Sequence, residues 1–349
     1  MPEPTARKPQ MHLDLLRLFA AFCVIALHVL SPWHSSLPDF GTRTWHVVNI
    51  LNELVRTGVP IFLMLTGCLL LPAPSTKEFG PFYRRRLTRI LVPFLVWDIV
   101  YYVVYRVQAG QPLSLRAFVD ELLNQGSAYH LWYVYTLAAI YLLLPFLARA
   151  LDGCSNRQIF WLVVIAAFPA TLRTFINITT PFYVYLTEPL MEGYLGYVLL
   201  GYWLSRIKLS RLTAWAIPVC GIGGWVMGVC FNYFRSSPEG LDLYFNGGYT
   251  LNHYLLAAAL FLAARHLRLP DSPRLSAILH KLSGLTYTVY LAHVLVLAVL
   301  ARVLPMPTPA LEIAVYPIVC FLLCLALAWG LYLAQREAVG LLLKRKAAD

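Results

Sequence analysis

Long apolar runs separated by short polar segments extend along the whole chain. A hydrocarbon core of about 30 Å is crossed by about 20 apolar residues in a helix, and about ten runs approach that length. The pattern therefore predicts an all-α, polytopic membrane helix bundle of about ten transmembrane helices. No connection is long enough for a separate domain, so residues 1–349 are expected to form one membrane domain. The expected spans are residues 12–33, 47–71, 87–107, 130–149, 158–177, 189–205, 212–233, 250–266, 283–303 and 310–334.

Two segments depart from this pattern. Residues 111–125 are amphipathic instead of uniformly apolar, which is typical of a helix lying in the membrane interface, here on the outer face. The span at residues 189–205 is the weakest, because it is short and is interrupted by Glu192, Gly193 and Gly196.

Composition supports a membrane protein. Hydrophobic residues make up 59% of the chain and charged residues 13%, whereas a soluble domain carries about 25% charged residues. The seven cysteines lie almost entirely in apolar runs, and none has the spacing of a metal ligand with a histidine. We interpret them as small hydrophobic residues, and predict no disulfide framework and no metal site.

The net charge of +11 would suit a nucleic-acid partner, but its distribution indicates membrane topology instead. Lys and Arg concentrate in alternate loops and near both ends of the chain. Cytoplasmic loops of membrane proteins carry an excess of these residues. The pattern therefore predicts that both termini are cytoplasmic, and it removes the need for a nucleic-acid partner.

Two ionisable side chains stand on the first span. Arg17 and His28 are eleven residues apart, which is about 16 Å along a helix and about three turns, so both lie on nearly the same face. Ionisable groups at membrane depth usually mark a functional site. The alternative is that Arg17 reaches the inner headgroups and that His28 lies in the interface.

Other spans also carry polar groups. Asn49, Asn52, Glu53 and Arg56 follow i, i+3, i+4, i+7 spacing, so this face should turn into the bundle. The alternative is an internal pairing that only holds helices together. His293 lies near the middle of an otherwise apolar span, where it is either functional or hydrogen-bonded to a neighbouring helix.

A basic cluster and an aromatic group flank two further spans. Arg84, Arg85, Arg86 and Arg89 precede the third span, and arginine is suited to bidentate capture of phosphate. Lipid headgroups and topology give an alternative explanation. His130-Leu131-Trp132-Tyr133 opens the fourth span, where an interfacial aromatic belt would explain Trp132 and Tyr133 without any function.

These elements, in this order, resemble the acyltransferase family 3 of integral membrane proteins, and the similarity extends over the first nine spans. Thr66 and Thr286 stand where the family usually has serine, and Tyr133 stands where it usually has phenylalanine. Closest in character are the surface-polysaccharide O-acyltransferases. The resemblance is carried by Arg17-x10-His28, Gly58-Val59-Pro60-Ile61-Phe62 through Thr66-Gly67, Arg86-x-x-Arg89 with Pro93, Leu131-Trp132-Tyr133, and Leu285-Thr286-Tyr287 through His293.

The resemblance implies transfer of an acyl group from cytosolic acyl-CoA, most often acetyl-CoA, to a hydroxyl of a lipid-linked or surface glycan at the outer side of the inner membrane. His28 would be the general base. Arg17 would bind a donor phosphate or stabilise developing negative charge. His293 would orient His28 or the acyl group. Residues expected to form the donor site are Arg56, Arg86, Arg89, Trp132, Tyr133, Tyr287 and His293.

Two alternatives stay open at this point. Direct transfer is preferred, because no Ser or Cys stands at a spacing that identifies a nucleophile for an acyl-enzyme. A transporter or glycan flippase would explain polar residues within spans equally well, although no inverted halves are evident. The sequence makes no prediction of the oligomeric state, of the acceptor sugar or of its hydroxyl.

Overall fold

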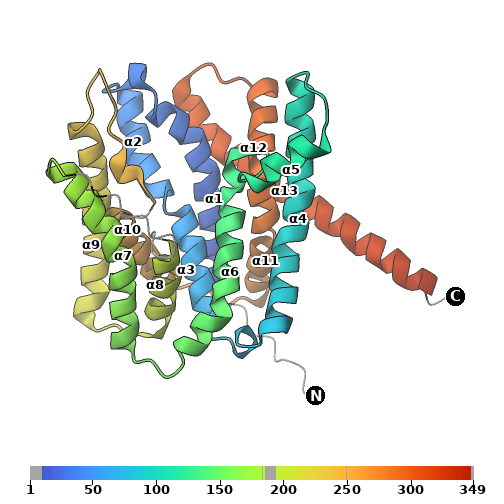
Figure 1. The fold of residues 1–349 in the computed structure, drawn as a ribbon, viewed down its shortest axis with the longest axis horizontal. Coiled ribbons are helices and arrows are strands. Elements are labelled where there is room, and N and C mark those ends of the chain that lie inside the picture. Colours follow the sequence, from blue (N-terminus) through green and yellow to red (C-terminus); the bar gives the residue numbers. More distant parts are fainter. Residues whose placement is uncertain (1–9, 183, 185–193, 249, 347–349) are drawn as a thin grey trace.

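A computed structural model describes residues 10–182, 184, 194–248 and 250–346 of the chain. The helices stand side by side in one bundle (Figure 1), and no strand occurs in the described part of the chain. The predicted all-α membrane bundle is therefore confirmed. The helices are α1 (Met11–His34), α2 (Arg43–Val55), α3 (Gly58–Leu70), α4 (Phe79–Gln108), α5 (Leu115–Leu123), α6 (Trp132–Ala150), α7 (Asn156–Thr179), α8 (Tyr194–Arg206), α9 (Arg211–Phe234), α10 (Leu251–His266), α11 (Pro273–Gly284), α12 (Thr286–Val303) and α13 (Pro309–Lys346).

Eight helical segments of the described chain are long and apolar enough to cross a membrane. Two of the expected spans are shorter in the structure. The span predicted at 250–266 is α10, with 16 residues, and the span predicted at 189–205 is α8, with 13 residues. Residues 189–193 of that prediction lie outside the described part of the chain. The protein is thus a multi-pass membrane protein whose two short helices pack within the bundle.

The span predicted at 47–71 is broken in two. α2 ends at Val55 and α3 begins at Gly58. The Thr57 hydroxyl donates a hydrogen bond of 2.7 Å to the carbonyl oxygen of Leu54, which satisfies a group at the helix end. Pro60 follows in the first turn of α3, where its missing N–H loses no helical bond. An uninterrupted apolar run hid this break in the sequence.

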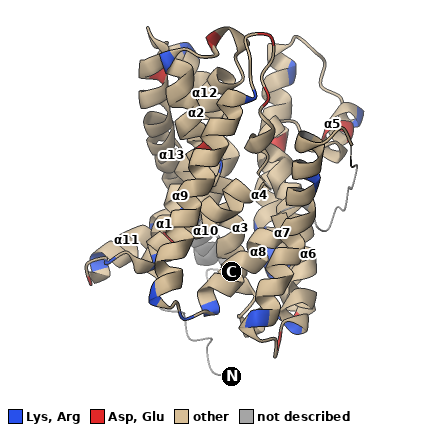
Figure 2. Ribbon diagram, turned by 90° about the vertical axis from the view of Figure 1, so that its left-hand side faces the viewer, with Lys and Arg blue, Asp and Glu red and all other residues tan. Residues whose placement is uncertain are grey.

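The two ends of the bundle differ in charge. We call the end at which α1 begins the N-terminal end, and the other the opposite end. Figure 2 shows much of the Lys and Arg gathered near the N-terminal end, at the bottom of the view. This is the pattern expected for a cytoplasmic face, but the orientation in a membrane stays a prediction.

Two short helices lie outside the predicted spans. α5 occupies part of segment 111–125, and its place at a membrane surface stays a prediction. α11 was not predicted. It begins with Pro273 at its first position, preceded by Ser272, whose hydroxyl accepts a hydrogen bond from the Leu275 N–H. Its mixture of polar and apolar residues is also typical of a loop between two membrane spans.

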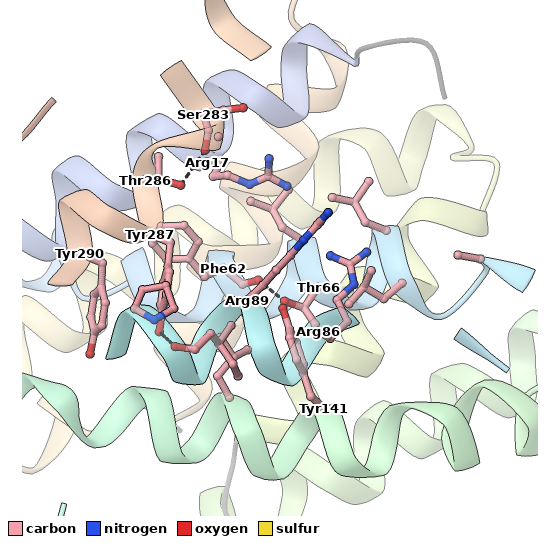
Figure 3. A pocket seen from close by; sticks show the side chains of 18 of the residues that line it. Arg17, Phe62, Thr66, Arg86, Arg89, Tyr141, Ser283, Thr286, Tyr287 and Tyr290 are labelled. Carbon is pink, nitrogen blue, oxygen red and sulfur yellow. Dashed lines mark hydrogen bonds between the residues drawn. The ribbon is translucent and has the colours of Figure 1, made fainter. Parts of the chain in front are cut away.

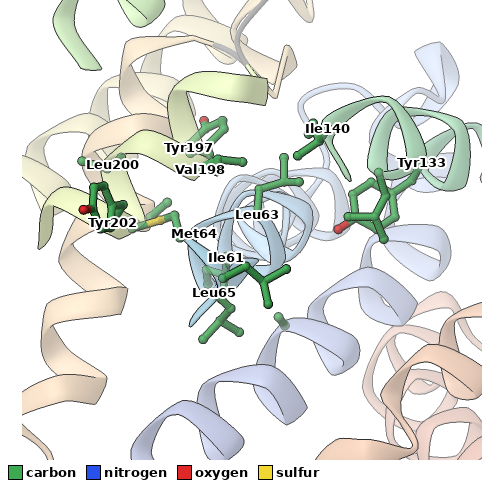
Figure 4. Packing of buried hydrophobic residues seen from close by; sticks show 14 of the residues in the cluster. Ile61, Leu63, Met64, Leu65, Tyr133, Ile140, Tyr197, Val198, Leu200 and Tyr202 are labelled. Atoms are coloured by element: carbon green, nitrogen blue, oxygen red, sulfur yellow. The ribbon is translucent and has the colours of Figure 1, made fainter. Parts of the chain in front are cut away.

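The centre of the bundle is α3. Its apolar side chains pack against α8 on one side and α6 on the other (Figure 4). α3 and α8 approach closely because glycines face the partner backbone: a Cβ on Gly67 would lie 1.8 Å from the Val198 carbonyl oxygen, and one on Gly201 would lie 2.1 Å from that of Met64. Small residues allow such close packing between membrane helices. This core fixes the wall of the cavity described next.

Candidate active site

A cavity of about 1080 Å³ lies between α1, α3, α4, α6 and α12. Its volume is at the upper end of the roughly 300–1,000 Å³ usual for ligand pockets. Pro74, Ser75 and Glu78, in the connection from α3 to α4, line it and are exposed, so it opens at the N-terminal end. Tyr133 and Tyr290 line it farther along the bundle.

Three arginines face the cavity. Arg17 comes from α1, and Arg86 and Arg89 stand one turn apart on α4, so that the three guanidinium groups lie near one another (Figure 3). Among the described residues, neither Arg86 nor Arg89 has a hydrogen bond or an ion pair with another side chain. The neighbouring Arg84 and Arg85 are exposed and do not line the cavity. The cavity therefore offers cationic donors suited to a phosphate-bearing ligand.

Arg17 is held by a buried carboxylate. A guanidinium nitrogen of Arg17 lies 3.5 Å from an oxygen of Asp14, which stands one turn earlier on the same helix. Asp14 also accepts a hydrogen bond of 2.5 Å from the Ser283 hydroxyl and lies 3.3 Å from Nδ1 of His280. Asp14 thus ties α1 to α11 and limits the directions that Arg17 can take.

Tyrosine rings form the wall beyond the arginines. The Tyr287 hydroxyl donates a hydrogen bond of 2.7 Å to the carbonyl oxygen of Ile90, which fixes α12 against α4. The rings of Tyr133 and Tyr290 lie 5.6 Å apart, centroid to centroid. The Tyr290 hydroxyl donates to the carbonyl oxygen of His130. We call Tyr133 and Tyr290 the tyrosine layer.

Beyond this layer lie three imidazoles, which we call the histidine cluster: His28 on α1, His130 just before α6, and His293 on α12. Ring centroids are 5.0 Å apart for His28 and His293, 4.8 Å for His130 and His293, and 6.4 Å for His28 and His130. Among the described residues, no group of three His, Cys, Asp or Glu side chains is arranged to hold a metal ion.

The three histidines differ in their partners. Nδ1 of His28 lies 3.3 Å from the Tyr129 hydroxyl, and Nδ1 of His293 lies 2.5 Å from the carbonyl oxygen of Tyr290. Within the described part of the chain, both ring nitrogens of His130 and Nε2 of His293 are buried with no hydrogen-bond partner. Buried polar nitrogens without partners are rare in proteins and mark a site where another polar group could bind.

Access also differs within the histidine cluster. His130 and His293 are buried, whereas His28 is half-buried beside Tyr129, which is 64% exposed. None of the three histidines lines the cavity. The tyrosine layer separates the two regions, since the Tyr290 ring lies 5.6 Å from that of His130 and 5.8 Å from that of His293. His28 can therefore be reached from outside the bundle without passing through the cavity.

The predicted site residues divide into three groups. Arg17, Arg86, Arg89, Tyr133 and Tyr287 come together around the cavity. His28 and His293 come together in the histidine cluster. Although Arg17 and His28 stand on one helix, they serve these two different regions.

The third group lies outside the cavity lining. Arg56, between α2 and α3, donates a hydrogen bond of 3.0 Å to the carbonyl oxygen of Asn246. Trp132 packs its ring 5.4 Å from that of Tyr194. Neither side chain lines the cavity, and the donor-channel role expected for these two residues stays a prediction.

The interfacial-belt interpretation is wrong for Tyr133, and His130, at the start of the same segment, is buried as well. His130 is 1% exposed and Tyr133 is 6% exposed, so neither meets the membrane surface. The segment instead turns into the bundle, and places His130 in the histidine cluster and Tyr133 in the wall of the cavity.

The polar face predicted on α2 does turn into the bundle. Asn49, Asn52 and Glu53 are buried. The Glu53 carboxylate accepts hydrogen bonds of 2.8 Å from Asn232 and 3.1 Å from Asn252. These bonds join α2 to α9 and α10.

Two buried ionisable residues were missed. His34, at the end of α1, lies 3.0 Å from Asn49 through Nε2 and 3.1 Å from Asn52 through Nδ1. Asp98, on α4, is fully buried and accepts a hydrogen bond from the backbone N–H of Ser127. The rule that singled out Arg56 applies equally to Asp98, because both are charged residues within an apolar run.

Comparison with known proteins shows the family to which the chain belongs. A family model described as an acyltransferase domain matches residues 12–332. A serine/alanine racemase of Enterococcus gallinarum is 29% identical over 157 residues, which are 43% of this chain and 21% of the racemase. The succinoglycan biosynthesis protein ExoH of Rhizobium meliloti (strain 1021) is 20% identical over 215 residues, which are 59% of this chain and 57% of ExoH.

The chain thus spans less than two thirds of the length of either relative. No solved structure matches it significantly. The family match, by contrast, runs from the start of α1 into α13 and takes in both the cavity and the histidine cluster. The chain therefore belongs to the acyltransferase family 3 of multi-pass membrane proteins.

Proposed function

We propose that this protein is a membrane-bound O-acetyltransferase. It transfers an acetyl group from acetyl-CoA to a hydroxyl of a lipid-linked or surface glycan at the outer side of the inner membrane. One observation carries the proposal: a cavity lined by Arg17, Arg86 and Arg89 extends from the N-terminal end to the tyrosine layer, which borders the histidine cluster.

The donor side rests on charge and size. Coenzyme A carries phosphates at one end and the thioester at the other. The arginines near the mouth of the cavity would bind the phosphates, because guanidinium groups donate bidentate hydrogen bonds to phosphate oxygens. The thioester would then point along the bundle toward Tyr133 and Tyr290. With both termini cytoplasmic, the mouth faces the cytosolic supply of acetyl-CoA.

The acceptor side rests on access to His28. This half-buried imidazole lies beside the exposed Tyr129, so a glycan hydroxyl can approach it from outside the bundle. ExoH is by its name a succinoglycan biosynthesis protein, which supports a polysaccharide as the acceptor. Several hydroxyls of such an acceptor could compete for the imidazole, and the shape of the opening near Tyr129 would select among them.

The reaction needs one proton acceptor. When Nδ1 of His28 donates its hydrogen to the Tyr129 oxygen, Nε2 keeps the lone pair. The thioester end of the donor has to pass between Tyr133 and Tyr290 to reach His28. Nε2 then takes the proton of the glycan hydroxyl while the hydroxyl oxygen attacks the thioester carbonyl. The carbon–sulfur bond breaks, the ester forms, and the coenzyme thiolate takes the proton from the imidazolium. Transfer is direct and passes through no acyl-enzyme.

The test is acetyl transfer by the purified protein. Replacing His28 with alanine removes the base, and general bases contribute about 100- to 10,000-fold to rates, so transfer from radiolabelled acetyl-CoA to glycan should fall by that order. His266→Ala is the matched control, because His266 is exposed and its ring nitrogen Nδ1 bonds the carbonyl oxygen of Leu262 on its own helix. A His28→Ala variant as fast as wild type would overturn the assignment of the base.

The same assay separates an acyltransferase from a transporter or flippase. A transporter leaves the thioester intact, so labelled acetyl-CoA would persist with the purified protein even when acceptor is present. An acetyltransferase releases free coenzyme A in step with labelled glycan. Intact acetyl-CoA in the presence of a folded protein and a suitable glycan would therefore count against the proposed function.

A further inference from the structure

A buried aspartate stands within α4 at membrane depth. Asp98 is ten residues before the end of α4 at Gln108, which corresponds to about 15 Å along the helix. Its side chain is 0% exposed. A carboxylate at this depth is expensive unless it has a specific partner. Among the described residues, Oδ1 of Asp98 has a backbone N–H as its partner instead of a cation, and Oδ2 has no hydrogen-bond partner.

The partner belongs to a turn that enters the bundle. Asp98 Oδ1 accepts a hydrogen bond of 2.6 Å from the N–H of Ser127. Gln125 and Gly126, just before it, both have positive φ angles, 85° and 88°. A Cβ on Gly126 would lie 3.1 Å from Oδ1 of Asp98, so the turn packs directly on the carboxylate. Irregular backbone at membrane depth is tolerated only where protein satisfies it.

This turn delivers two residues to the histidine cluster. Two positions after Ser127, Tyr129 places its hydroxyl 3.3 Å from Nδ1 of His28. The next residue, His130, places its ring 4.8 Å from that of His293. Tyr129 and His130 follow Ser127 by two and three positions, so a shift of the turn moves both side chains.

We propose that Asp98 is a positioning residue for His28. Its carboxylate holds the 125–131 turn in place, and the turn holds the Tyr129 hydroxyl against Nδ1 of His28, which leaves Nε2 directed to the reacting hydroxyl. The catalytic part of this inference rests on the proposed function, whereas the geometric part does not.

The chemistry explains why an acceptor is needed at this position. A carboxylate oxygen accepts short, strong hydrogen bonds from backbone N–H groups. Asparagine keeps one such acceptor oxygen with nearly the same shape, whereas leucine keeps the volume and loses the acceptor. Asp98→Asn should therefore preserve the turn, and Asp98→Leu should release it.

The kinetic test compares these two variants. A displacement of about 1 Å at a catalytic group can lower a rate by about 100-fold, so kcat of Asp98→Leu should fall by that order while KM for acetyl-CoA stays within about twofold. Asp98→Asn should recover most of kcat. Tyr102→Phe is the matched control: the Tyr102 hydroxyl also bonds α4 to the outer connection, at Ser114, away from the histidines.

A second measurement needs no activity. Diethyl pyrocarbonate acylates a ring nitrogen that carries a lone pair, which is Nε2 alone while Nδ1 donates to Tyr129. Once Tyr129 no longer covers Nδ1, either nitrogen can carry the lone pair and react, so the total rate of His28 carbethoxylation, read by mass spectrometry, reports whether Nδ1 is covered. His28 should react severalfold faster in Asp98→Leu and in Tyr129→Phe than in wild type, and at the wild-type rate in Asp98→Asn and Tyr102→Phe. Tyr129→Phe removes only a hydroxyl from an exposed residue, so it keeps the test decisive if Asp98→Leu does not fold.

The outcomes separate the two proposals. Faster labelling in both loosened variants, with no acetyl transfer even by wild type, would support the positioning of His28 and contradict the proposed function. Unchanged labelling and unchanged kcat in Tyr129→Phe would overturn the positioning role, whatever the wild-type activity. A loss of kcat in Asp98→Leu that Asp98→Asn does not recover would also overturn it.

Discussion

Ionisable residues inside the bundle meet three different environments. Arg86 and Arg89 face an open cavity with no acidic partner in the described part of the chain. His130 and His293 are surrounded by aromatic rings. Glu53 is surrounded by amides and one imidazole, His253, whose Nε2 lies 3.4 Å away. A group without a partner in an open cavity is free to bind a ligand, whereas a fully bonded group stabilises the fold.

The first prediction concerns the two partnerless arginines. Arg86→Gln and Arg89→Gln should each weaken acetyl-CoA binding by about 10- to 100-fold, because a charged hydrogen bond contributes about 1.5 to 3 kcal/mol. Isothermal titration with the detergent-purified protein measures this. Arg84→Gln and Arg85→Gln change the same charge on the same helix outside the cavity. Equal weakening by all four variants would show that only the overall charge matters.

The second prediction concerns Glu53. Its replacement by alanine should lower the free energy of unfolding by about 2 to 5 kcal/mol, because the amides of Asn232 and Asn252 lose a buried acceptor. Unfolding in detergent titrated with dodecyl sulfate measures the change. Glu239→Ala, at an exposed position, should leave it nearly unchanged. Similar stabilities for both variants would contradict a structural role of Glu53.

The sequence reveals single candidate site residues, but it does not reveal which side chains of other helices lie beside them. Arg17, His28 and His293 could be singled out because each is ionisable within an apolar span. Spacing along one helix could not show that Arg17 and His28 serve different regions, since the tyrosines that separate them come from α6 and α12. Two residues on the same face of a helix need not belong to the same site, because side chains from other helices can separate them.

Single elements of this bundle depart from ideal helices where polar groups cluster. The break between α2 and α3 consists of Arg56 and Thr57. The 125–131 turn enters the bundle beside Asp98. Membrane proteins place irregular backbone where protein or a cavity satisfies it. A long apolar run predicts where a helix crosses the membrane. A break of only two residues in the helix does not end the apolar run, so the sequence does not reveal the break between α2 and α3.

The third prediction tests the contact between two elements. Gly67→Ala should destabilise the fold by about 1 to 3 kcal/mol or more, because the new Cβ would collide with the backbone of α8. Gly223→Ala, on a face of α9 with open space around it, should be neutral or stabilise by about 0.5 to 1 kcal/mol, because alanine favours helix. Detergent unfolding curves compare the two. Equal stability of both variants would contradict close packing of α3 and α8.

The molecule as a whole has two ends with different openings. The cavity opens at the N-terminal end, where the exposed Ser75 and Glu78 line it. His28 is reached beside Tyr129 instead. Hydrophobicity and the distribution of Lys and Arg were enough to predict the class of the bundle. The cavity could not be predicted in this way, since five helices from distant parts of the sequence enclose it.

The fourth prediction concerns orientation in the membrane. In a background without the seven native cysteines, a membrane-impermeant maleimide should label Gly240→Cys in intact cells and Arg85→Cys only after lysis. Both positions are exposed, and they lie at the opposite end and the N-terminal end of the bundle, respectively. The reverse pattern would place both termini outside, and would turn the mouth of the cavity away from the cytosol.

The tyrosine layer also bears on the permeability of the membrane. A water-filled path as wide as the cavity, continued past Tyr133 and Tyr290, would conduct protons and other ions. Each elementary charge that crosses a potential of 100 mV dissipates about 2.3 kcal/mol. Two aromatic rings at the end of the cavity act as an electrical insulator, so a cell can keep its electrochemical gradient with an opening of this size built into its membrane.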